Sequence, residues 1–298
     1  MRFLRPHVVL LVLAAYVPLA IAQDQSVAPP TTYTYHAINF PEATNTYAYG
    51  INNMGEVVGG YTGAGCSQSE CGFTEVKGVY TGFECSPFDE TIAFDINNKD
   101  EIIGSYATND DGAVVGMVYE GANSCNPVFD PLATNLTEAW GVNDSGVIVG
   151  FYTDSAGNFQ GFRDVDGTYT TIACPDIADT RAFGVNDTNI VVGDTSASTA
   201  GPFSGMMYKS GKCTSVNFPK AVSTSAKGIN KTGEISGWYT DSTGVTHGFA
   251  KTGSTFQSIN YPGATGTLAY HLNDSGQIPG YYSDSAGAVH GFIAIPKQ

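Results

Sequence analysis

The chain has 298 residues and a formal net charge of −15, with 13 Lys and Arg against 28 Asp and Glu. An acidic chain with so few basic side chains argues against nucleic acids, anionic membranes and polyanionic ligands as partners. Its 36 Gly, 17 Tyr and 16 Phe residues, with few charges, are typical of a β protein rich in turns.

The N-terminal residues predict an export signal. Arg2 and Arg5 give a positive start, residues 8–13 are apolar, and residues 20–22 form a small-x-small cleavage sequence. No later stretch approaches the length of a transmembrane helix. We therefore predict a secreted protein, extracellular or periplasmic, without membrane insertion. The expected organisation is a signal peptide at 1–22, a flexible leader at 23–32 and one folded domain at 33–298.

One pattern recurs six times in the rest of the chain. It consists of Gly, Asp or His, then an aliphatic residue and Asn, with a second aliphatic residue and a Gly five and seven positions after the Asn. A fixed period of this length is typical of repeat proteins, in which each unit buries its apolar face against its neighbours. The copies begin at Gly50, Asp95, Gly141, Gly184, Gly228 and His271, at steps of 43–46 residues.

The fifth repeat gives the clearest secondary structure. Residues 224–230, 234–239, 247–250 and 256–261 have the alternating, aromatic and β-branched character of short strands, and Gly, Asp, Ser and Thr fill the turns between them. No useful length of sequence has a helical period. Four antiparallel strands in about 44 residues are the blade of a β-propeller.

The two ends of the chain complete each other. The last repeat supplies only three strands and finishes with residues 290–295, whereas residues 33–40 match the fourth strand of the preceding repeat, at 256–261. An N-terminal strand that completes the last blade closes the ring and removes its open sheet edges. We therefore predict an all-β, six-bladed propeller.

The repeats also help to pair the six cysteines. Cys85 and Cys174 stand just before a repeat proline, and Cys125 and Cys213 each stand six residues before the next one. An exported chain favours disulfides. We predict the pairs Cys85–Cys125, Cys174–Cys213 and Cys66–Cys71, with unpaired thiols as the alternative.

The repeat resembles the HAF-repeat family of exported bacterial proteins. The residues that carry this resemblance are the His-Gly-Phe sequences at 247–249 and 290–292, with variants at 160–162 and 71–73. It covers residues 33–295 and implies export and a repeat fold, but no particular activity.

The propeller geometry places the candidate sites. The strand before each repeat Asn should be innermost, so the loops that precede it and the loops after the second strand share one face, and the Asn hairpins lie on the other. Ligand sites favour such loop-built ends of a rigid scaffold. We expect the site at the first of these faces.

Residues that differ between repeats are the best candidates, because packing asks for the same residue in every blade. Glu138 and Arg181 would form a general acid with an electrostatic partner, or else a structural ion pair. Asp95 and His271 replace the repeat Gly and would act together as a base or bind a metal, or else merely line the channel. These four are the catalytic candidates.

The other repeated residues have structural alternatives. The Asn residues suit turns, and the tyrosines that end the second strands suit packing between blades. His247 and His290 lie near Asp241 and Asp284, where they would either bind a ligand or cap loops. Calcium at the Asp-Ser-Gly turns is an alternative to the expected absence of a cofactor. The ligand-binding candidates are Tyr47, Tyr49, Trp140, Lys227, Tyr270, His247 and His290.

Three functions are compatible with these features. The first is a monomeric binding module for a polysaccharide or cell-surface component. The second is a glycan-cleaving enzyme, a hydrolase or a lyase, that uses the four catalytic candidates. The third is a structural envelope protein. The sequence has no Gly-x-Ser-x-Gly, His-Glu-x-x-His or phosphate-loop motif, which argues against the familiar hydrolase triads.

Overall fold

The computed structural model describes residues 32–297, except 64, 68, 86–89 and 109–111. The predicted signal peptide, and all of the predicted leader but its last residue, lie outside the described residues. Thr31–Gln298 form one compact unit.

The described residues form 24 strands in six four-stranded antiparallel sheets. The first blade comprises β2 (Ala43–Ile51), β3 (Val57–Gly63), β4 (Cys71–Val76) and β5 (Val79–Phe83), and the second β6 (Glu90–Ile96), β7 (Ile102–Ala107), β8 (Val114–Gly121) and β9 (Ser124–Val128). The third comprises β10 (Thr137–Val142), β11 (Ile148–Thr153), β12 (Phe159–Val165) and β13 (Thr168–Ile172), and the fourth β14 (Asp179–Val185), β15 (Val191–Ser196), β16 (Ser204–Lys209) and β17 (Lys212–Ser215). The fifth comprises β18 (Ser223–Ile229), β19 (Ile235–Thr240), β20 (Thr246–Thr252) and β21 (Thr255–Ile259), and the sixth β22 (Gly266–Ala269), β23 (Ile278–Ser283), β24 (Val289–Pro296) and β1 (Tyr33–Ile38).

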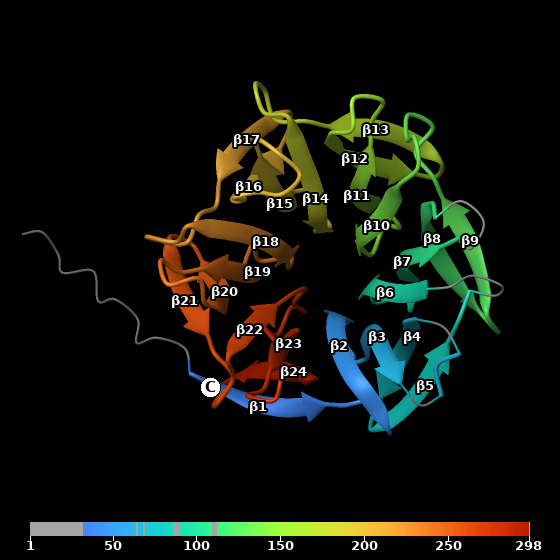
Figure 1. Ribbon diagram of the computed structural model, residues 1–298. Coiled ribbons are helices and arrows are strands. Elements are labelled where there is room, and N and C mark those ends of the chain that lie inside the picture. The colour runs from blue at the N-terminus through green and yellow to red at the C-terminus, as the bar shows by residue number, and fades with distance from the viewer. Residues whose placement is uncertain (1–31, 64, 68, 86–89, 109–111, 298) are drawn as a thin grey trace, which may run out of the picture. The chain divides into compact units, whose positions relative to one another are not determined.

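The sheets surround a central axis, with β2, β6, β10, β14, β18 and β22 innermost (Figure 1). The N-terminal strand β1 is the outermost strand of the sixth blade and pairs with β24 from Tyr33 opposite Pro296 to Ile38 opposite Gly291. The predicted six-bladed propeller, and its closure by the N-terminal strand, are confirmed. Within the described part of the chain, no helix is long and apolar enough to cross a membrane.

The core lies between the blades. An alanine in each innermost strand is fully buried, and the third strands of four blades bury Phe73, Phe162, Phe249 and Phe292 completely. One apolar cluster, for example, joins Val58 of the first blade to Ala93 of the second. Because each blade covers the apolar face of its neighbour, the ring is stabilised at every interface, by about 1.5–3 kcal/mol for each fully buried large side chain.

The tyrosines that end the second strands pack between blades, as predicted. Tyr61 stacks on Phe40 and Tyr239 on Phe218, each with ring centroids 3.7 Å apart. Phe40 follows β1 of the sixth blade and Phe218 follows β17 of the fourth, so each stack joins two neighbouring blades.

All three predicted disulfides are present: Cys66–Cys71, Cys85–Cys125 and Cys174–Cys213. Cys85 follows the first blade and Cys125 belongs to the second, so this bond ties neighbouring blades together. Cys174–Cys213 does the same for the third and fourth.

Candidate functional site

An aromatic layer fills the central axis. Its members occupy equivalent places in five of the innermost strands and directly after the sixth, β22: Tyr49, Phe94, Trp140, Phe183, Lys227 and Tyr270. Phe94 and Trp140 stack with centroids 3.8 Å apart, and Tyr49 meets Tyr270 edge-on at 4.8 Å. We call this set the aromatic layer. Because large rings from neighbouring blades pack against one another, the axis is closed at this level.

The aromatic layer separates the four catalytic candidates into two pairs. Glu138 and Arg181 stand two residues before it in their strands, toward the face that carries the proline loops. Asp95 and His271 stand one residue after it, toward the Asn hairpins. We call these two faces the proline face and the hairpin face. The structure thus places the two pairs on opposite sides of the layer and does not bring the four residues together.

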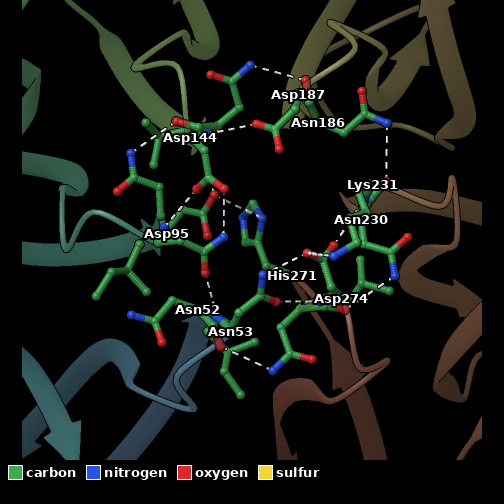
Figure 2. A pocket seen from close by; sticks show the side chains of 18 of the residues that line it. Asn52, Asn53, Asp95, Asp144, Asn186, Asp187, Asn230, Lys231, His271 and Asp274 are labelled. Atoms are coloured by element: carbon green, nitrogen blue, oxygen red, sulfur yellow. Dashed lines mark hydrogen bonds and ion pairs between the residues drawn. The ribbon is translucent and has the colours of Figure 1, made fainter.

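A pocket lies on the hairpin face, opposite to the face where we expected the site (Figure 2). It encloses about 520 Å³, with the open space at its mouth included. Its floor holds Asp95 and His271 and an aliphatic ring of Ile51, Ile96, Val142, Val185, Ile229 and Leu272. Its rim consists of the residues that follow the repeat Asn: Asn53, Asn98, Asp144, Asp187, Lys231 and Asp274. We call it the hairpin pocket.

The repeat Asn residues build the wall of this pocket. Asn143 Oδ1 accepts hydrogen bonds of 3.0 Å from the backbone N–H groups of Ser145 and Val147, which holds the hairpin turn. Its Nδ2 donates to the carbonyl of Asn186 in the next blade, at 3.1 Å. The predicted turn function is confirmed, and the link between blades is an addition that was not predicted. Equivalent links to the next blade are made by Asn97, Asn186, Asn230 and Asn273.

The rim is a second ring of hydrogen bonds between blades. The backbone N–H of Asn98 donates to Asp144 Oδ1 at 2.9 Å, and that of Asp144 donates to Asp187 Oδ1 at 3.0 Å. The next bond of this series would run from the backbone N–H of Asp187 to the side chain of Lys231. Lys231 cannot accept it, because an ammonium only donates. Its Nζ instead pairs with Asp274 Oδ2 at 2.9 Å. Among the described rim residues, the ring is thus interrupted at one position, between Asp187 and Lys231.

Asp95 and His271 meet at the floor, as the sequence suggested. His271 Nδ1 lies 3.5 Å from Asp95 Oδ2, which also accepts a 3.0 Å hydrogen bond from the Val142 N–H. Glycines allow the close approach of the strands here: a Cβ on Gly228 would lie 2.6 Å from the Cα of His271. His271 is 4% exposed, and its Nε2 is buried without a hydrogen-bond partner among the described residues.

The surroundings suppress the charge on both residues. Burial raises the pKa of Asp95 to about 8, although the N–H groups of Val142 and Ile96 oppose the shift. Burial and the nearby Lys227 ammonium lower the pKa of His271 to about 3, against the Trp140 carbonyl. Near pH 7 the pair is therefore largely uncharged, with a carboxylic acid beside a neutral imidazole.

Glu138 and Arg181 do not form the predicted ion pair. Arg181 Nε instead bonds to Asp194 Oδ1 at 2.9 Å, and the guanidinium carbon lies 4.1 Å from the ring centroid of Phe203. Glu138 Oε2 accepts a 2.6 Å hydrogen bond from the indole N–H of Trp140. Desolvation raises the pKa of Glu138, against the Trp140 hydrogen bond and the charges of Lys227 and Arg181.

Lys227 is a buried amine in the aromatic layer. Its Nζ lies 3.2 Å from the ring centroid of Phe183 and 4.7 Å from that of Trp140. Burial lowers its pKa to about 7, although Asp194 and Glu138 oppose the shift. A buried amine that titrates near neutrality would serve as a proton donor or acceptor.

Sequence reasoning missed Asp194 and Glu70 on this side of the layer. Asp194 stands where the other second strands carry Gly60, Ser105, Phe151, Trp238 and Tyr281. A comparison of equivalent positions in the second strands of the six repeats would have identified Asp194, because no other repeat has a charged residue there. Glu70 lies outside the repeat pattern; burial and the charge of Glu90 raise its pKa to about 7, and its Oε1 has no hydrogen-bond partner in the described part of the chain.

The remaining ligand-binding candidates fall into two groups. Tyr49, Lys227 and Tyr270 are buried in the aromatic layer, whereas Tyr47 and Trp140 are partly exposed. Tyr47 and Trp140 are therefore the members of this group whose side chains present accessible surface.

His247 and His290 occupy the loop-capping position. Their Nε2 atoms lie 3.1 and 3.2 Å from the carboxylates of Asp241 and Asp284. The carboxylate of Asp241 also accepts the N–H groups of its own turn. These contacts match the structural alternative for both histidines.

The described residues contain one group of three His, Cys, Asp or Glu side chains close enough to share an ion: Cys66, Cys71 and Glu84. Its two cysteines form a disulfide. The rim carboxylates of Asp144 and Asp274 are bonded to neighbouring hairpins instead.

Comparison with solved structures identifies similar folds. The structure of AofleA from Arthrobotrys oligospora matches with a TM-score of 0.55 and 10% identity over 89% of this chain and 88% of that one. The Aleuria aurantia lectin, a fungal six-bladed propeller that recognises fucose, matches with a TM-score of 0.50 and 14% identity over 89% of this chain and 91% of that one.

A variant of the Aleuria aurantia lectin in complex with Fucα1-6GlcNAc matches with a TM-score of 0.52 and 12% identity, over 88% of this chain and 97% of that one. At such identities the likeness shows the fold alone. No protein-family model and no curated protein matches the chain.

Proposed function

We propose that this protein is a secreted carbohydrate-binding propeller and that one sugar residue binds in the hairpin pocket. The observation that carries the proposal is a concave pocket with an aliphatic floor and a rim of amide and carboxylate groups.

The chemistry of the rim suits a sugar. Hydroxyl groups both donate and accept hydrogen bonds, and amide and carboxylate oxygens each have two lone pairs. Asp187 Oδ1 accepts one bond from the rim, which leaves the rest of this exposed carboxylate to a ligand.

Two further observations support the proposal. The similar lectin propellers bind fucose and a fucosylated disaccharide. Three disulfides suit an extracellular or periplasmic protein, because such compartments are oxidising.

The test is a glycan array followed by titration calorimetry of each hit, with Asp187→Ala on the hairpin face and Tyr47→Ala on the proline face. We expect at least one sugar to bind, with a loss of affinity of tenfold or more in Asp187→Ala and little change in Tyr47→Ala. The opposite order would move the site to the proline face. No binding to any glycan by a folded protein would reject the proposal.

A glycan-cleaving enzyme is the second candidate function. It is favoured by Glu70, Glu138 and Lys227, which gather around the aromatic layer on the proline side, and of which Glu70 and Lys227 have pKa values near 7. Groups that titrate near the working pH are suited to acid–base catalysis.

A polysaccharide panel tests this second candidate, with new reducing ends and unsaturated-sugar absorbance as readouts. Turnover that is lost in Lys227→Met, while the variant stays folded, would establish it. No product on any substrate would reject it and leave the binding module or the structural envelope protein.

A further inference from the structure

We infer that the hairpin pocket selects a sugar residue with a free amine, and thus a cationic amino sugar over its neutral or acidic counterparts. This inference rests on the proposed carbohydrate-binding function. It follows from the charge of the rim, the interruption in the rim and the unused polar group at the floor.

The rim is anionic. It holds the carboxylates of Asp144, Asp187 and Asp274 against the single ammonium of Lys231. The floor supplies no compensating cation, because His271 is neutral near pH 7. A positively charged group is therefore attracted to the mouth of the pocket, and a uronic acid is repelled.

The interruption in the rim marks where an ammonium would bind. The ammonium of Lys231 is engaged by Asp274, whose Oδ1 also accepts the Lys231 backbone N–H at 3.2 Å. Asp187, on the other side of the interruption, is exposed and makes no ion pair within the described part of the chain. A ligand amine at this position would donate to the Asp187 carboxylate.

The floor offers a second unused group. The imidazole of His271 lies beside Asp95 and lines the pocket, as Figure 2 shows. Less than a tenth of the surface of His271 is exposed. With Nδ1 directed at Asp95, Nε2 is left as a buried nitrogen without a well-formed hydrogen bond to a described residue, although the Trp140 carbonyl acts on the ring. Such groups are uncommon in folded proteins, and a ligand donor is one way to satisfy them.

These features favour an organic amine over a metal ion. No set of three metal-ligating side chains within reach of one ion occurs here among the residues described. An ammonium needs no such set: it has three donors and gains charge-assisted hydrogen bonds, which are roughly twice as strong as neutral ones. A neutral sugar would also donate hydroxyl hydrogen bonds to these carboxylates, but it would gain no attraction between opposite charges.

The test uses three tetrasaccharides that share the β1–4 glucose backbone: the glucosamine tetramer, its N-acetylated form and cellotetraose. At pH 6 and low salt, we expect the glucosamine tetramer to bind at least tenfold more tightly than the other two. The preference should shrink as salt is added, because the rim is exposed to solvent.

Three variants locate the effect. Asp187→Asn keeps the Oδ1 acceptor but removes the charge, and should reduce the preference to about threefold or less. Lys231→Gln removes the competing ammonium and should increase it. Asp166→Asn is the matched control. Asp166 is an exposed carboxylate in the turn between β12 and β13, at the outer side of the third blade. Its φ of 50° is one that Asn also adopts.

Each outcome is informative. Equal affinity for the three tetrasaccharides, with sensitivity to Asp187→Ala, would overturn the amine preference and leave the proposed function standing. An equal loss in Asp187→Asn and Asp166→Asn would mean general attraction to an acidic protein and would also overturn it. Failure of every glycan on the array would overturn both.

Discussion

The side-chain amide of Asn273 donates a hydrogen bond of 3.1 Å to the backbone carbonyl of Asn52. It joins the hairpin of the last blade to that of the first, across 221 positions of sequence. The same amide-to-carbonyl bond links the second to the sixth blade in order. Between the first and second blades, Asn52 Nδ2 donates instead to Asp100 Oδ1 at 3.4 Å, and the Asn53 N–H donates to Asn98 Oδ1 at 2.7 Å. The ring is thus closed by polar contacts on the hairpin face as well as by β1 at its outer edge.

Removal of one link should destabilise the whole ring. Asn143→Ala loses two hydrogen bonds in its turn and one to the next blade. At about 1 kcal/mol each, we expect a loss of about 3 kcal/mol in the free energy of unfolding, measured by urea titration with circular dichroism. Asn39→Ala, at an exposed position outside this network, is the control and should change stability by less than about 0.5 kcal/mol. Equal effects in the two variants would contradict a role for the ring in stability.

The disulfide between the first two blades should stabilise more than the short one. Cys85–Cys125 spans 40 positions and Cys66–Cys71 spans 5. Chain entropy then gives about 4 kcal/mol for the first and about 2 kcal/mol for the second. Double alanine variants of each pair, compared by denaturant unfolding, check the difference. A larger loss from the short loop would show that chain entropy does not govern these bonds.

Asp95 should make stability fall as the pH rises. Its pKa is raised to about 8 in the folded state from 3.8, so the folded protein binds more protons in this interval than the unfolded chain. The stabilisation that the protonated Asp95 carboxyl contributes is complete below about pH 4 and is lost as the pH approaches 8. Relative to Asp95→Asn, the wild type should thus lose unfolding free energy steadily between pH 4 and 8. A difference that stays constant over this range would exclude a protonated Asp95.

Lys227 should make the free energy of unfolding rise with pH, in the range above pH 7. Its pKa is lowered to about 7 from 10.5, so between these values the unfolded chain binds the extra proton. The wild type should therefore gain unfolding free energy relative to Lys227→Met as the pH rises from 7 to about 10. Lys209→Met, on the surface, controls for the loss of one lysine. If the unfolding free energies of Lys227→Met and of the wild type changed in parallel between pH 7 and 10, the Lys227 amine would have an ordinary pKa and would be hydrated.

The fold was predictable because each local signal agreed with the others. The repeat period gave the blades, and the similarity between residues 33–40 and 256–261 gave the closure. The positions of Cys85 and Cys174 relative to the repeat prolines gave two of the disulfides. Such agreement between local pattern and global topology is expected of a repeat protein, in which each unit contacts only its neighbours.

The site was less predictable because its position depends on side-chain volume at the axis. Variation between repeats identified Asp95 and His271 as a pair, but not that Trp140 and Phe94 would close the axis between them and Glu138. It also placed Arg181 beside Glu138, whereas Asp194 from the neighbouring strand was nearer. Repeat positions fix which strand a residue occupies, and the packing of large rings then decides which residues meet.

The interruption of the rim at Lys231 has a consequence for recognition. Six identical hairpins would present the same contacts at every sixth of a turn, so a small ligand would bind in six equivalent orientations. The single cation at Lys231, together with the unequal pair Asp95 and His271 beneath it, makes one direction in the pocket different from the other five. A ligand that contacts both features has one preferred orientation, and its two ends can be told apart.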